Sequence, residues 1–219
     1  MEELYRYVSG LIKDVKLLGL GTGRTVKGLI DYLHREGLLE GKEIVVSSID
    51  TELYLKSLGY KVRNLDFRPQ VYVDGFDLFL EDKGSLIKGG GGAMTREKIV
   101  AFNSDYRVYI GDQSKVRGDR IITLPVEVLG FSLWQFLSFM KSKGFEARVR
   151  QGQGKMGPVV SDNGNPIVDV EVERDRVKEL AELLDSTPGV VEHGYFGEEL
   201  IDEVAVFKEG LVKVVKQRK

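Results

Sequence analysis

The chain has 219 residues, of which 42% are hydrophobic and 30% charged, so it can form one large domain or a main domain with a smaller partner. Its formal net charge is −2 and it has no basic cluster, which argues against nucleic acid or a membrane surface as a partner. It has no cysteine, which excludes disulfides and thiolate metal sites. Because neither a signal-peptide pattern nor a run of 18 apolar residues is present, we expect a cytoplasmic protein.

Strands and helices are expected to alternate over the first half of the chain. The expected strands are short apolar runs, at residues 15–20, 43–48, 70–74 and 107–112. The expected helices have apolar residues at helical spacing or end at a glycine, at residues 4–12, 25–37, 51–59 and 94–102. This alternation predicts a mostly parallel, Rossmann-like sheet with both faces covered.

The rhythm changes from about residue 124. The expected elements are a strand, a helix, two strands, a helix and a strand, at residues 124–128, 132–144, 146–150, 166–172, 175–185 and 189–194. This β-α-β-β-α-β order predicts a small ferredoxin-like α+β domain over residues 124–199. Two further strands, at 203–209 and 211–216, are too few for a domain and are expected to return to the first sheet. The Rossmann-like catalytic domain would then comprise residues 1–123 and 200–219.

Four unusual loops are expected to lie at the carboxyl ends of the strands of the first sheet. They cover residues 21–25, 74–77, 88–92 and 112–115. Ligands of open parallel sheets bind at the carboxyl ends of the strands, so we expect these loops to form one site.

The first of these loops lies in the segment GLGTGRT, from Gly19 to Thr25. Its backbone amides and the following helix N-terminus can attract an anion, and the hydroxyls of Thr22 and Thr25 add donors. It is not a dinucleotide fingerprint, because the third glycine would fall at Arg24, and it is not a P-loop, because no Gly-Lys-Ser/Thr follows. A tight turn without a ligand is the alternative interpretation.

The next two loops contain acids and a base. Asp74 and Asp77 stand three residues apart at a strand end, although an Asp-Gly pair is also common in solvated turns. Lys88 precedes four glycines, residues 89–92, and Glu97 follows in the first turns of a helix. A flexible loop with Glu97 as an ordinary N-terminal helix acid is the alternative. We favour a ligand, because glycines admit close approach of the backbone and a structural turn rarely needs four.

The remaining candidate groups indicate structure rather than chemistry. His34 is expected to be exposed and His193 structural, and two such distant histidines do not make a metal site. Trp134 and its aromatic neighbours are expected in the core. The four loops together suggest proton abstraction next to a carbonyl, with a phosphate clamp fixing the orientation.

The chain closely resembles the ribose-5-phosphate isomerase family of the A type. The matching segments keep the family's order and approximate spacing over nearly the whole chain. They are GLGTGRT, VSSIDTE, VDGFD, LIKGGGGAMTREKIVA, GDQSKV, LPVEVLGF, SDNGNPIVDV and PGVVEHGYF. The glycine run with the Arg-Glu-Lys that follows it is the most specific of these.

The resemblance implies interconversion of D-ribose 5-phosphate and D-ribulose 5-phosphate in the non-oxidative pentose phosphate pathway. It implies Glu97 as the general base, Lys88 as the group that stabilises an enediolate oxygen, and Asp74 and Asp77 as hydroxyl-binding acids. It also implies a substrate site made by residues of all four loops: Thr22, Gly23, Arg24, Thr25, Asp74, Gly75, Phe76, Asp77, Lys88, Gly89, Gly90, Gly91 and Lys115. No metal and no organic cofactor are implied, and a homodimer or homotetramer is expected.

Three positions depart from the family pattern. Arg24 stands where serine is usual, Phe76 where alanine is usual, and Leu78 where an acidic residue is common. These departures affect the expected substrate affinity and pocket shape. The alternative functions are a non-catalytic sugar-phosphate sensor, an acyl-CoA transferase and an aminosugar-phosphate deaminase. The sensor would normally need an output module, and none is visible in the sequence.

Overall fold

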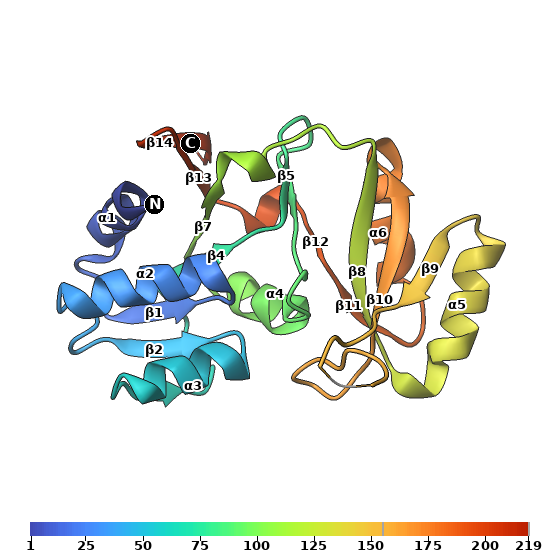
Figure 1. The fold of residues 1–219 in the computed structure, drawn as a ribbon, viewed down its shortest axis with the longest axis horizontal. Helices are drawn as coiled ribbons and strands as arrows, with labels where there is room; N and C mark the ends of the chain where they lie inside the picture. The colour runs from blue at the N-terminus through green and yellow to red at the C-terminus, as the bar shows by residue number, and fades with distance from the viewer. Residues whose placement is uncertain (155, 219) are drawn as a thin grey trace.

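The computed structural model describes residues 1–154 and 156–218, whose strands form three sheets (Figure 1). The largest sheet has seven strands in the order β14-β13-β7-β4-β1-β2-β3. Its strands are β1 (Leu17–Leu20), β2 (Glu43–Val46), β3 (Val62–Arg63), β4 (Val71–Gly75), β7 (Tyr106–Asp112), β13 (Glu203–Lys208) and β14 (Leu211–Gln217). All neighbours run parallel except β13 and β14. The predicted return of the last two strands to the first sheet is therefore confirmed.

Helices cover this sheet on both faces. They are α1 (Glu2–Ile12), α2 (Arg24–Arg35), α3 (Ile49–Ser57) and α4 (Met94–Phe102). In β4, Val71 and Val73 belong to the apolar core that includes residues of α1 and α2. Tyr72 lies between them and belongs to the opposite core, with Val100 of α4. Successive strand residues face opposite sides, so an apolar strand such as β4 serves both cores.

The second sheet has four antiparallel strands in the order β11-β8-β10-β9. Its elements along the chain are β8 (Ile121–Val128), α5 (Leu133–Ser142), β9 (Glu146–Val149), β10 (Ile167–Glu173), α6 (Val177–Asp185) and β11 (Val190–His193). One core joins the sheet to both helices and includes Phe136 of α5 and Leu180 of α6. The predicted β-α-β-β-α-β order is confirmed, and with it the mixed α/β fold class.

A small third sheet was not expected from the sequence. It consists of β5 (Leu78–Leu80), β6 (Ser85–Ile87) and β12 (Tyr195–Phe196), in the order β12-β6-β5. Strands of two or three residues are too short to give a periodic pattern. We retain as a proposal the division into residues 1–123 with 200–219 and residues 124–199, although β8 begins at Ile121 and β12 pairs with β6 across that division.

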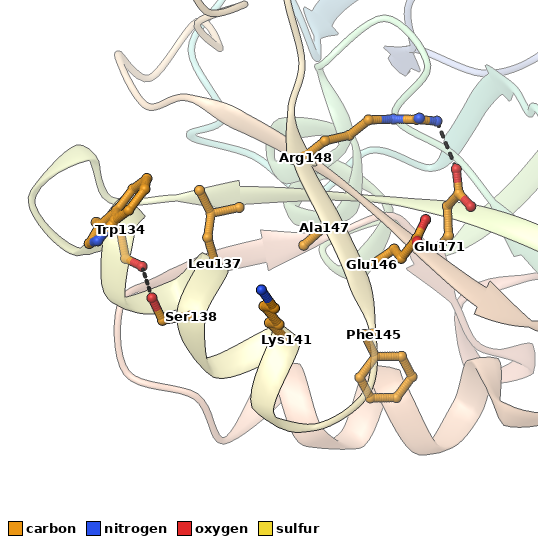
Figure 2. Close-up of a pocket in the computed structure, with 9 residues that line it drawn as sticks. All are labelled: Trp134, Leu137, Ser138, Lys141, Phe145, Glu146, Ala147, Arg148 and Glu171. Atoms are coloured by element: carbon orange, nitrogen blue, oxygen red, sulfur yellow. Dashed lines mark hydrogen bonds and ion pairs between the residues drawn. The ribbon is translucent and has the colours of Figure 1, made fainter.

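The prediction that Trp134 lies in the core is wrong, because 75% of the side chain is exposed. α5 buries Phe136 and Met140. At about 100° per residue, a position two residues before Phe136 lies on the other side of the helix. Trp134 instead borders a surface cavity of about 510 Å³ between α5 and β9, together with Leu137 and Phe145 (Figure 2). No helix within the described residues is long and apolar enough to cross a membrane.

Candidate active site

A cavity of about 750 Å³ lies where β1, β4 and β7 end, and all four of the unusual loops line it. The lining side chains and backbone come from residues 1, 5, 22–25, 75–77, 88–91, 97, 112, 114 and 115. Every site residue predicted from the sequence lines this cavity except Asp74. Asp74 is fully buried, and its carboxylate contacts the ammonium of Lys88.

Lys88 connects two carboxylates from different elements. Its Nζ lies 2.8 Å from Oδ2 of Asp74 at the end of β4, and 3.2 Å from Oε2 of Glu97 in α4. It also donates a hydrogen bond to the carbonyl oxygen of Gly75. Burial alone would lower the pKa of the Lys88 ammonium, but the two carboxylates raise it overall. Lys88 is therefore held as a cation inside the cavity.

Glu97 presents a buried carboxylate to the cavity. It lies in the first turn of α4, and only 5% of the residue is exposed. Its Oε2 forms the ion pair with Lys88 but has no hydrogen-bond partner among the described residues. Burial, and then the charge of Asp74, raise the pKa of Glu97 to about 8, although Lys88 lowers it. A carboxylate in this setting can accept a proton near neutral pH.

Asp74 is fixed by hydrogen bonds to both oxygens. Its Oδ1 accepts from the backbone amides of Thr22 (3.0 Å) and Gly75 (2.7 Å), and its Oδ2 from the hydroxyl of Tyr72 (2.6 Å). A Cβ at residue 21 would lie 1.8 Å from Oδ1 of Asp74, so Gly21 makes this approach possible. Gly21, which follows β1, thus has a structural reason in addition to anion binding.

The glycine run lines the cavity next to Asp77. The amide of Gly90 donates a 2.7 Å hydrogen bond to Oδ2 of the exposed Asp77. Gly89 has φ of +96°, a conformation that glycine adopts without strain. A Cβ on Gly91 would meet nothing within 4 Å, and Gly91 lines the cavity. Only part of the glycine run is therefore explained by the protein's own contacts, as expected if a ligand occupies the rest.

The far end of the cavity suits an anion. α2 begins there after Gly23 without a side-chain cap, which leaves backbone N–H groups of its first turn without an intrahelical partner. The exposed Arg24 and the half-buried Lys115 also line this end. Burial lowers the pKa of the Lys115 ammonium. The Lys115 ammonium donates a hydrogen bond to the carbonyl oxygen of Phe76 and lies 5.5 Å from the centre of the Phe76 ring. Phe76 therefore holds the Lys115 ammonium in place at the cavity.

Sequence reasoning missed several residues of the lining. Asp112 and Ser114 belong to a loop that was singled out for Lys115 alone, and Oδ1 of Asp112 accepts from the amide of Ser114 (2.8 Å). Met1 and Tyr5 of the N-terminal segment also line the cavity, and no motif indicated them. An amphipathic helix pattern predicts which face is buried, not which end reaches a ligand.

The histidines lie outside this cavity. His34 is exposed, as expected. His193 is buried, and its Nε2 lies 2.9 Å from Oδ1 of Asp185. Burial, and then the charge of Lys98, lower the pKa of His193. This histidine serves the contacts between β11 and α6.

The fold and the cavity define a class of protein: an α/β enzyme with a buried base beside a cation at one end of its site and a cationic helix N-terminus at the other. The family model of ribose 5-phosphate isomerase A (phosphoriboisomerase A) matches residues 43–210. A ribose-5-phosphate isomerase A of Archaeoglobus fulgidus is 42% identical over 200 residues, which are 89% of this chain and 88% of that protein. One of Bifidobacterium longum is 41% identical over 204 residues, 90% of this chain and 86% of the relative. The chain belongs to the ribose-5-phosphate isomerase A family.

Solved structures agree with this assignment. The structure of ribose 5-phosphate isomerase A from Methanocaldococcus jannaschii has a TM-score of 0.88 and 32% identity, with 99% of this chain and 97% of that chain covered. A D-ribose-5-phosphate isomerase in complex with phospho-erythronic acid has a TM-score of 0.89 and 27% identity, with the same coverage. The family identified from the sequence motifs is thereby confirmed.

Proposed function

We propose that this chain interconverts D-ribose 5-phosphate and D-ribulose 5-phosphate through an enediolate, with Glu97 as the general base. The isomerase activity follows from membership of the family, because relatives named ribose-5-phosphate isomerase A align with most of this chain. The observation that carries the proposed mechanism is the buried oxygen of Glu97. It has no hydrogen-bond partner among the described residues and lies 3.2 Å from the Lys88 ammonium.

The proposed reaction moves one proton between neighbouring carbons of the open-chain sugar. The Glu97 carboxylate takes the proton from C2 of the aldose, and the electron pair of the C–H bond forms the double bond of an enediolate. The carbonyl oxygen at C1 gains negative charge, which the Lys88 ammonium stabilises inside a buried site. Glu97 then returns its proton to C1, and the ketone forms at C2.

A second proton must move between the two oxygens for the reaction to balance. The hydroxyl at C2 loses its proton as that carbon becomes a ketone, and O1 gains one. We assign this transfer to Asp77, which lines the cavity beside Gly90, and to Asp74, which lies beneath the cavity in contact with the Lys88 ammonium. Acids and bases of the chain supply every step, so the proposed chemistry requires no metal and no organic cofactor.

The phosphate of the substrate would bind at the N-terminus of α2. Its partners would be the first-turn amides, the hydroxyls of Thr22 and Thr25, and the cations of Arg24 and Lys115. The relative solved with phospho-erythronic acid supports a phosphorylated sugar acid or sugar as the ligand type. We also propose a cytoplasmic homodimer or homotetramer, from the absence of cysteine and from the family.

A direct assay tests this function. The purified chain should convert ribose 5-phosphate to ribulose 5-phosphate in the presence of EDTA. Glu97→Gln should lower kcat by about 10³-fold, the range of general acid–base contributions, yet keep the Kd for phospho-erythronic acid within about threefold. Glu146→Gln, at an exposed position of β9, is the matched control and should retain wild-type activity. A Glu97→Gln protein with wild-type kcat would contradict the assignment. A sensor would bind ligand without turnover in the wild-type chain.

A further inference from the structure

Glu127 of β8 is a buried carboxylate outside the cavity whose partners come from two distant parts of the chain. The residue is 0% exposed. Its Oε1 accepts from the hydroxyl of Ser161 (2.8 Å) and from the side-chain amide of Asn165 (2.8 Å). Both of its oxygens lie 3.2 Å from the side-chain amide of Asn163. Its Oε2 accepts from the hydroxyl of Thr95 in α4.

All four donors are neutral hydroxyl or amide groups. A buried carboxylate in such a setting depends on keeping its full set of hydrogen bonds, because each lost partner leaves a costly unsatisfied group. The arrangement is therefore rigid. Moving Thr95 relative to Ser161 or the two asparagines would break bonds to the same carboxylate.

This arrangement connects the second sheet to the helix that carries the proposed base. Thr95 is the second residue of α4 and Glu97 the fourth, so both belong to its first turn. The N-cap residue of that helix, Ala93, provides no side-chain hydrogen bond. The Thr95 hydroxyl thus gives this turn a side-chain link to β8 that the helix does not obtain from its cap.

The loop of residues 161–165, which contacts Glu127, also forms hydrogen bonds to α4. Nε of Arg96 donates to Oδ1 of Asn163, and its Nη2 donates to the carbonyl oxygen of Asp162, both at 2.8 Å. Oδ2 of Asp162 accepts from the amide of Ile49 at the start of α3, also at 2.8 Å. Arg96, which lies between Thr95 and Glu97 in the first turn of α4, is therefore bound to the loop whose Ser161, Asn163 and Asn165 side chains contact Glu127.

We infer that Glu127 is a positioning residue for catalysis, acting through Thr95 to hold the first turn of α4 so that Glu97 stays at its place beside Lys88 and the substrate carbon. This inference rests on the proposed role of Glu97. Glu127 does not line the cavity, so its effect reaches the reaction only through α4. A displacement of about 1 Å at a reacting group can cost roughly 100-fold in rate.

The sharpest test removes only the link between Glu127 and α4. Thr95→Val keeps the side-chain shape but removes the hydroxyl, and Thr95→Ser keeps the hydroxyl. We expect Thr95→Val to lower kcat roughly 10- to 100-fold with KM changed less than about threefold, because the phosphate contacts remain. Thr95→Ser should restore kcat to within about threefold of wild type. Wild-type kcat in a folded Thr95→Val protein would overturn the inference.

Glu127→Gln tests the carboxylate itself. The new amide would present N–H groups to donors, so we expect a similar fall in kcat and a shifted pH profile of kcat/KM. The matched control is Glu203→Gln, another 0% exposed carboxylate, which accepts from the hydroxyls of Tyr7 (2.8 Å) and Tyr106 (3.0 Å). It should lower the unfolding temperature without changing kcat or the pH profile. Equal kcat losses in the two glutamine variants would contradict a specific positioning role.

The outcomes separate this inference from the proposed function. If Glu97→Gln retains turnover, the proposed base is wrong and the inference fails with it. If Glu97→Gln is inactive but Thr95→Val and Glu127→Gln keep wild-type kcat per folded molecule, only the positioning role is wrong. Should Glu127→Gln fail to fold, the comparison of Thr95→Val with Thr95→Ser decides the matter.

Discussion

The two large sheets contribute to one cavity in different ways. The seven-stranded sheet places Asp74 at a strand end, and its loops bring Lys88 and Glu97 beside it. Among the described residues, those that line the cavity include none from the four-stranded sheet or its helices. That sheet region instead holds α4 through Glu127, and it holds the glycine run through Arg150 just beyond β9. Under the proposed mechanism and the inference from Glu127, the first region supplies the reactive groups and the second fixes their positions.

The difference also appears in the kind of contact each region makes. Charged groups contact one another at the cavity, where burial and then the charge of Asp74 raise the pKa of Glu97 to about 8 although Lys88 lowers it. At Glu127 a buried carboxylate meets only neutral donors. Reactivity needs an incompletely satisfied group, whereas positioning needs a fully satisfied one.

Replacing the cation of the first region should have the largest effect after loss of Glu97 itself. Lys88→Met leaves Asp74 and Glu97 buried without their shared ammonium, so the enediolate oxygen loses its stabilising charge. We expect kcat to fall by roughly 10²- to 10³-fold in steady-state assays. Lys98→Met is the matched control, because Lys98 is also largely buried and pairs with Glu192 outside the cavity. If Lys98→Met lowered kcat as much as Lys88→Met, the loss could not be assigned to a specific contact between the Lys88 ammonium and the enediolate oxygen.

The pH dependence should report the buried base. Glu97 must be ionised to accept a proton, and its pKa is raised to about 8, so activity is lost as the pH falls below that value. We expect kcat/KM to rise roughly tenfold per pH unit up to about pH 8 and then to level off. A profile measured from pH 5.5 to 9 that is already flat above pH 6 would contradict a raised pKa. The Thr95→Val variant should shift the rising part of the kcat/KM profile. Such a shift would show that the contact between Glu127 and Thr95 affects the ionisation of Glu97.

Arg150 offers a second way to weaken the positioning region. Its Nη1 donates to the carbonyl oxygens of Gly89 (2.8 Å) and Gly90 (3.1 Å), and its guanidinium pairs with Asp169. We expect Arg150→Met to lower kcat/KM about tenfold, because the carbonyl oxygens of Gly89 and Gly90 lose their hydrogen bonds to the guanidinium. Arg148→Met is the control, since Arg148 is exposed and pairs with Glu171. Equal kcat/KM values for Arg150→Met and Arg148→Met would mean that the conformation of the glycine run does not depend on Arg150.

Arg24 should give the smallest of these effects and should change binding rather than chemistry. It lines the cavity at the start of α2, and a guanidinium can bind a phosphate with two hydrogen bonds. We expect Arg24→Ser to raise KM about five- to tenfold with kcat changed less than twofold. The phosphate-free sugar ribose, assayed at high concentration, should not distinguish the variant from wild type. An unchanged KM for ribose 5-phosphate would remove Arg24 from the phosphate site.

Short-range patterns were enough to predict much of this molecule. The apolar runs gave the strands of the first sheet other than β3 to within a few residues, and the helix at residues 94–102 has the predicted bounds. The four loops could be assigned to one site because parallel strands end at one edge of a sheet. The short strands β3, β5, β6 and β12 could not be predicted, because two or three residues carry no periodicity.

By itself the sequence determined the fold class, the family and the groups placed in the cavity, because local periodicity and motif spacing encode these directly. Tertiary structure alone decided that Trp134 is exposed, that Asp74 lies beneath the cavity and that Arg150 reaches the glycine run from 61 residues away. It also decided the environment of Glu97 and the partners of Glu127. Burial and hydrogen bonding between residues far apart in the chain depend on how whole elements pack, and no short stretch of sequence records that packing.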